Sequence, residues 1–163
     1  AEETGITLRI KRFRSVRDHC ARDRRNAETY GTIYCWEDWI KARHFRSDYT
    51  LVLSPPVFDF WGKRLLIWGM ASGVCRKGKN AIAVGGVEMQ NQDGNPRWEH
   101  SIIVVMHELG GHLFGAYHDP ILYDGLATVM HPGALAYVDL QPRMQFSDLS
   151  LSQIYNCTRG IKR

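Results

Sequence analysis

Residues 107–119 have the sequence HELGGHLFGAYHD, which holds three imidazoles, one carboxylate and three glycines. A catalytic zinc ion takes three protein ligands and leaves a fourth position for water. Neutral imidazole suits zinc, so His107, His112 and His118 are the candidate ligands. Glu108 follows the first of them directly and is the candidate general base that takes a proton from the water. The third glycine is expected to end a helix and let the chain return with His118.

The spacing of the first two histidines is unusual, because His107 and His112 are five residues apart rather than four. In a regular helix this spacing leaves the two rings about 140° apart around the axis. A π-bulge at Gly110-Gly111 would absorb the extra residue and restore a common face. A second interpretation is that Glu108 and His112 share the face and His107 is displaced. A third is that the insertion abolishes zinc binding and leaves a non-catalytic protein.

This pattern resembles that of the metzincin zinc metalloproteases, H-E-x-x-H-x-x-G-x-x-H, with a one-residue insertion. The Asp119 that follows the third histidine makes it most similar to the reprolysin or adamalysin branch of snake venoms and tick saliva. Farther along, residues 127–132 (ATVMHP) resemble the family's Met-turn, in which the Met130 side chain would lie beneath the metal.

The resemblance covers most of the chain and implies a fold. Strand and helix patterns alternate along the sequence, which indicates an α/β (α+β) sandwich with a mostly parallel sheet. The resemblance adds a metzincin-like three-layer sandwich with a twisted sheet, a zinc-binding active-site helix and a Met-turn. Residues 1–163 would be a single metalloprotease catalytic domain in which the family's first strand and first helix have no counterpart.

The resemblance also implies how substrate binds. An extended peptide would pair with an edge strand at Gly69, Met70 and Ala71, and the wall of the pocket after the cut would follow the Met-turn. That wall would consist of Pro132, Gly133, Ala134 and Leu135. One catalytic Zn²⁺ is expected, and Ca²⁺, which some relatives bind, has no assigned ligands here.

The implied function is that of a secreted zinc-dependent endopeptidase. It would hydrolyse peptide bonds of extracellular proteins through a zinc-bound water, with Glu108 as general base. The rival interpretation is a catalytically inactive binding protein or toxin with the same fold.

The four cysteines are an even set that allows three pairings. The resemblance implies a bridge between Cys75 and Cys157, which leaves Cys20 with Cys35. Two disulfides indicate an oxidising compartment, so the protein is expected to be secreted and extracellular.

The composition limits the class of protein and the partners that it could bind. A chain of 163 residues with 44% hydrophobic residues can bury a core, and no apolar run is long enough for a transmembrane span. The net charge is +4, and arginine and lysine are dense over residues 9–25. Few aromatic residues stand between these charges, so no nucleic acid partner is expected. A protein or peptide substrate and a monomeric state are expected.

Hydrophobic periodicity predicts the order of elements. The C-terminal helix has Ser147 or Ser150 as its expected cap. Residues 57–61 are expected to be a turn region and residues 90–96 a loop. The expected strands are residues 6–13, 49–53, 65–74 and 81–87, and the expected helices are residues 26–46, 97–114 and 149–157.

Overall fold

The structure of the protein is a computed structural model of the 163-residue chain. It describes residues 9–16, 20, 29–43, 47–54, 57–60, 63–67, 69–78, 81–86, 98–120, 127–132 and 145–160.

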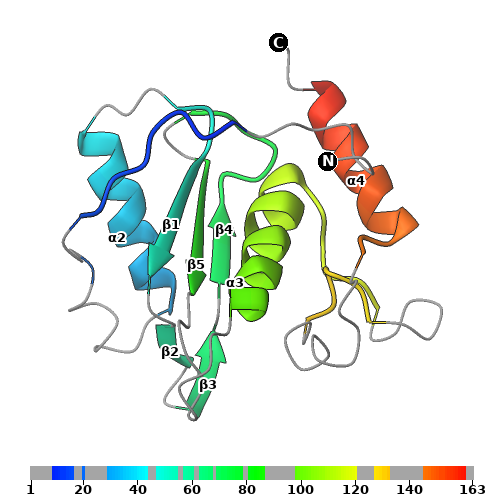
Figure 1. Ribbon diagram of the computed structural model, residues 1–163, viewed down its shortest axis with the longest axis horizontal. Coiled ribbons are helices and arrows are strands. Elements are labelled where there is room, and N and C mark those ends of the chain that lie inside the picture. Colours follow the sequence, from blue (N-terminus) through cyan, green and yellow to red (C-terminus); the bar gives the residue numbers. More distant parts are fainter. Residues whose placement is uncertain are drawn as a thin grey trace.

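A three-stranded mixed sheet lies at the centre of the described part (Figure 1). Its order is β1 (Thr50–Ser54), β5 (Ile82–Gly86) and β4 (Gly69–Ser72). β1 runs parallel to β5, whereas β4 runs antiparallel to it. The expected α/β architecture is therefore found. In this small sheet one of the two pairings is parallel, so the described strands show a mixed sheet rather than a mostly parallel one.

Helices pack on both faces of this sheet. Alternate residues of β5 point to opposite faces, so each face presents apolar side chains to a helix. Ile82 and Val84 belong to a cluster with Trp36 and Ile40 of helix α2 (Thr29–Ala42). On the other face, the buried Ala83 belongs to a cluster with Leu113, which lies on the histidine-bearing side. Figure 1 shows α2 and helix α3 (Trp98–Val105) on either side of the strands. The three layers place the histidine segment directly against the sheet.

The segment between β1 and β4 differs from its prediction. Residues 57–61 were expected as a turn and 65–74 as one strand. Instead β2 (Val57–Phe60) and β3 (Lys63–Ile67) form an antiparallel hairpin, separate from the sheet that contains β4. Valine and phenylalanine favour strands, and β3 provides a pairing partner for β2, so strand formation prevails over the expected turn.

The predicted strand over residues 6–13 is also wrong in its described part. Residues 9–16 form neither strand nor helix, and residues 6–8 lie outside the described residues. Ile10 and Phe13 are 85% and 82% exposed. Alternating apolar residues form a half-buried strand only when a neighbouring strand and a core receive them, and here these side chains face solvent.

The C-terminal helix α4 spans Asp148–Gly160, close to its predicted position. The Ser150 backbone N–H donates to the Ser147 hydroxyl at 3.0 Å, so Ser147 is the cap. The disulfide Cys75–Cys157 joins α4 to the turn after β4, and Cys20–Cys35 joins α2 to the chain before it. This is the pairing that the resemblance implied. Among the described helices, none has the length and apolar character needed to cross a bilayer.

Candidate metal centre

The extra residue between the first two histidines is taken up by a π-helical turn. α3 continues without a break into a π-helical turn, Met106–Gly111, which is followed by a 3₁₀ turn, His112–Phe114. The N–H of His112 points to the carbonyl of His107, five residues earlier, as well as to that of Glu108. The predicted bulge at the glycine pair is confirmed, and the helix keeps its direction while gaining one residue.

The π-helical turn brings the first two histidines to the same side, where the third joins them. The Nε2 atom of His118 lies 3.2 Å from that of His107 and 3.1 Å from that of His112. The three imidazoles are thus close enough to hold one metal ion. Two nitrogens on a tetrahedral zinc ion lie about 3.3–3.4 Å apart, given zinc–nitrogen distances of about 2.0–2.1 Å. His107 is not displaced, so the second interpretation of the spacing is wrong.

Backbone carbonyls orient two of the rings. Nδ1 of His107 lies 2.6 Å from the carbonyl of Val129, and Nδ1 of His112 lies 2.8 Å from that of Ala116. A carbonyl only accepts, so each Nδ1 carries the proton and donates it. Each Nε2 therefore keeps a lone pair directed toward His118, which is the tautomer that metal ligation at Nε2 requires.

The environment also keeps the rings neutral. Burial, followed by the neighbouring His112, lowers the pKa of His107 to about 4. Burial likewise lowers the pKa of His112 and of His118 below the ordinary histidine value. Neutral imidazole is the form that binds a metal, so the ligands are available at neutral pH without first losing a proton.

Gly115 turns the chain toward the third histidine. Its φ of 93° lies in the left-handed region that favours glycine, and its N–H donates to the carbonyl of His112 at 3.0 Å. A Cβ at this position would lie only 2.6 Å from the Cys75 sulfur, so the disulfide also excludes a side chain here. The helix must end at this residue, which fixes where His118 arrives.

Asp119 then anchors the chain immediately after the third histidine. Its carboxylate is buried and accepts hydrogen bonds from three hydroxyls. Ser147 donates at 2.7 Å, Ser150 at 3.0 Å, and Thr128 donates to the other oxygen. Its backbone N–H also donates to the carbonyl of Met130 at 3.0 Å. One side chain thus joins the His118 segment, the Met130 segment and the start of α4.

The segment around Met130 packs against the π-helical turn. Met130 is fully buried, and a Cβ on Gly111 would overlap its thioether. The same segment supplies the Val129 carbonyl that orients His107, and His131 N–H closes a turn onto the carbonyl of Thr128 at 3.1 Å. The turn expected around Met130 is therefore present and packs against the histidine segment.

Glu108 is buried against Gly69 of β4, an outer strand of the three-stranded sheet. Its pKa is raised to about 8 by burial, and Oε2 has no hydrogen-bond partner among the described residues. A Cβ on Gly69 would lie 2.7 Å from Oε1, so β4 approaches the carboxyl group closely and only glycine allows this. Of the expected substrate residues, Gly69, Met70 and Ala71 form this half-buried strand.

The remaining expected substrate residues lie after the Met130 turn. Pro132 is exposed, while Gly133, Ala134 and Leu135 lie outside the described residues. Sequence reasoning did not identify the carbonyls of Val129 and Ala116 or the hydroxyls around Asp119. The only hint in the sequence was Ser147 and Ser150, which were recognised as candidate caps but not as partners of Asp119.

No protein-family model, curated protein or solved structure matches the chain.

Proposed function

We propose that the protein is a secreted zinc-dependent endopeptidase of the metzincin type, similar to reprolysins. The observation that carries this proposal is the convergence of His107, His112 and His118 on one point in spite of their unusual spacing. A π-helical turn is rare and tends to occur at functional sites, since it disturbs a regular helix.

The donor set fits zinc better than other common ions. Three neutral nitrogen donors suit zinc, whereas calcium and magnesium prefer oxygen. The Nδ1 hydrogen bonds to Val129 and Ala116 are the outer partners that zinc-binding histidines usually have. A set of three protein ligands corresponds to a catalytic site rather than a closed structural one.

Glu108 is the group that would move protons. When bound, zinc lowers the pKa of a water and polarises a carbonyl. The Glu108 carboxylate accepts the proton of the attacking water and returns it to the leaving amine. In the metal-free protein burial raises the pKa of Glu108 to about 8, so the group is mainly protonated at neutral pH. A bound cation would lower that pKa and favour the carboxylate that accepts the proton.

The free edge of the sheet offers a place for the substrate. Among the described strands β4 pairs only with β5, so its other edge has backbone groups available for an extended peptide. Because Gly69 lies against Glu108, a peptide paired with β4 would pass the carboxylate. The two disulfides are consistent with an oxidising, extracellular location.

The test is hydrolysis of a mixed peptide library by protein treated with a chelator and then supplied with zinc. We expect no cleavage after chelation, recovery at one equivalent of zinc, and no recovery in Glu108→Gln. Zinc binding without any cleavage would instead support the inactive binding protein. Cleavage that survives chelation would exclude a metal-dependent mechanism.

A further inference from the structure

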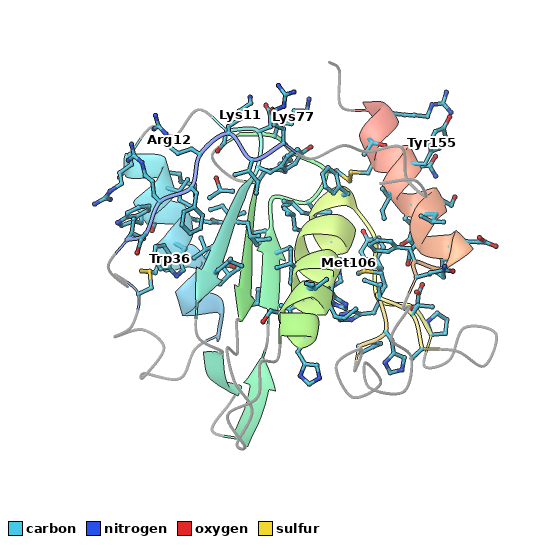
Figure 2. The ribbon with its side chains drawn as sticks, viewed as in Figure 1. Lys11, Arg12, Trp36, Lys77, Met106 and Tyr155 are labelled. Atoms are coloured by element: carbon cyan, nitrogen blue, oxygen red, sulfur yellow. A yellow bond between two sulfur atoms is a disulfide. The ribbon has the colours of Figure 1, made fainter. Side chains whose placement is uncertain are left out.

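The turn after β4 carries two exposed cations, Arg76 and Lys77. A second basic segment meets this turn at Asp48. Nζ of Lys11 lies 3.7 Å from the Asp48 carboxylate, and the Gly78 N–H donates to the Asp48 carbonyl at 2.7 Å. Figure 2 shows Lys11, Lys77 and Arg12 at the same end of the molecule. Exposed positive charge is thus concentrated where β4 ends.

This turn is held rigidly against the metal centre. Cys75, next to Arg76, is bridged to Cys157, and its N–H donates to the carbonyl of Leu113 at 3.0 Å. Leu113 directly follows His112 in the 3₁₀ turn. The backbone next to the two cations is therefore anchored beside the histidine segment.

β4 lies between the candidate base and the turn that carries these cations. The strand begins at Gly69, which lies against Glu108, and ends at Ser72, just before the turn. A peptide on the free edge of β4 forms the more stable ladder when it runs antiparallel. Its N-terminal arm then passes Ser72 and reaches the turn. At about 3.3 Å per residue, the residues about three to six positions before the cut come close to the cations.

We propose that Arg76 and Lys77, with Lys11 beside them, select substrates that carry acidic residues on the N-terminal side of the cleaved bond. This inference rests on the proposed peptidase function. Guanidinium and ammonium groups bind carboxylates by charge-assisted hydrogen bonds. A sulfated polysaccharide would also bind cations, but the cations are continuous with the strand expected to bind peptide, which favours an acidic peptide.

The experiment compares three peptides that share one cleavable core. One has glutamates on the N-terminal arm, one has them on the C-terminal arm, and one is neutral. At low salt we expect kcat/KM for the first to exceed that of the neutral peptide by about three- to tenfold, the size expected for a few exposed ion pairs. In Arg76→Glu/Lys77→Glu the ratio should fall to about one or below. Arg159→Glu, which reverses an exposed charge on α4, should keep the ratio.

Each other outcome overturns the inference. Equal rates for the three peptides would show that the turn does not select substrate. Preference for the C-terminal arm would contradict the antiparallel arrangement. Discrimination that is unchanged in the double variant would assign it to other residues. Tight heparin binding without discrimination between peptides would reassign the cations to a polysaccharide.

Failure of the proposed function is distinguishable from failure of this inference. If none of the peptides is cleaved, the peptidase proposal fails, and fluorescence anisotropy of the same labelled peptides then tests the cations alone. Tighter binding of the first peptide, lost in the double variant, would still support selection by Arg76 and Lys77. Equal affinities would refute it.

Discussion

The two halves of the histidine-bearing helix differ in geometry and in what their side chains do. In the first half, α3 is a regular helix that buries Ile103 and Val104, and it packs on the sheet close to Gly85. In the second half, Met106–Gly111 is π-helical and buries the carboxyl group of Glu108. The regular half contributes apolar contacts that stabilise the fold, whereas the irregular half contains the groups that could do chemistry. A local departure from helical geometry can therefore serve a site when adjoining regular structure holds it in place.

The largest expected effect comes from the irregular half. Glu108→Ala removes the proposed base, so kcat should fall by about 10²–10⁴-fold, the usual contribution of general acid–base catalysis. Peptide hydrolysis and zinc content measured on the same sample check this. Zinc should remain bound because the imidazoles are intact. Retained turnover would exclude Glu108 as the base.

Deleting Gly111 tests the π-helical turn itself. The deletion restores the four-residue spacing in sequence, but in this structure it rotates one histidine relative to Met130 and the Val129 carbonyl, which are positioned for the wider turn. Zinc affinity should fall by at least about 100-fold, since outer partners alone are worth 10–100-fold. Calorimetric titration measures this. A gain in affinity would mean that the native spacing is a defect.

In the regular half, Ile103→Ala should affect stability and leave the chemistry intact. Ile103 is only 8% exposed and belongs to the cluster with Phe114 and Val129. The free energy of unfolding should fall by about 2–4 kcal/mol, as in other large-to-small core changes. Chemical denaturation measures the loss. If the variant is folded and fully loaded with zinc but has a reduced kcat, the regular half of the helix would contribute to the chemistry, which contradicts this assignment.

The adjacent glycines Gly110 and Gly111 form a matched pair of sites with a smaller effect on stability. In Gly111→Ala the new methyl group overlaps the Met130 thioether, so stability should fall by about 1–3 kcal/mol. In Gly110→Ala the nearest atom is Cζ of Phe146 at 3.3 Å, which requires only a slight shift. Alanine also favours helix over glycine, so Gly110→Ala should be nearly neutral. Thermal denaturation compares the two variants, and equal losses would refute the packing of Met130 against Gly111.

Metal-free protein should also show a dependence of stability on pH. The folded pKa of Glu108 is raised to about 8, so its protonated form stabilises the fold below the ordinary value of 4.5. This stabilisation is lost as the pH rises from 4.5 to about 8. Glu108→Gln does not titrate, so the stability of the variant relative to the native protein should increase over that interval. Denaturation midpoints measured across it after chelation check this, and parallel pH profiles would contradict it.

The sequence allowed the centre of the site to be predicted because its constraints are local. Two histidines that are five residues apart, with two glycines between them, have few ways to bind the same metal ion. A π-helical turn is one of these ways. Gly115 and Ser147 have well-known roles at helix ends, so those boundaries were predictable as well.

The rest of the site could not be predicted because its partners are distant or carry no signature. Any residue offers a carbonyl, so nothing in the sequence marks Val129 or Ala116 as the acceptors for the histidines. Thr128, Ser147 and Ser150 are common residues, and only the fold brings them to Asp119. The strand predicted over residues 6–13 is not formed in residues 9–13. Alternation of apolar and polar side chains is compatible with a strand, but it does not show that a neighbouring strand is present.

Zinc K-edge X-ray absorption of the reconstituted protein shows directly whether His107, His112 and His118 bind one ion. With one equivalent of zinc we predict three imidazole nitrogens at about 2.0–2.1 Å and a fourth ligand that is the oxygen of a water molecule. His107→Ala, His112→Ala and His118→Ala should each lose one of the imidazoles. A shell with two imidazoles, or zinc bound equally well without His107, would show that the widened turn does not bring the three histidines to one ion.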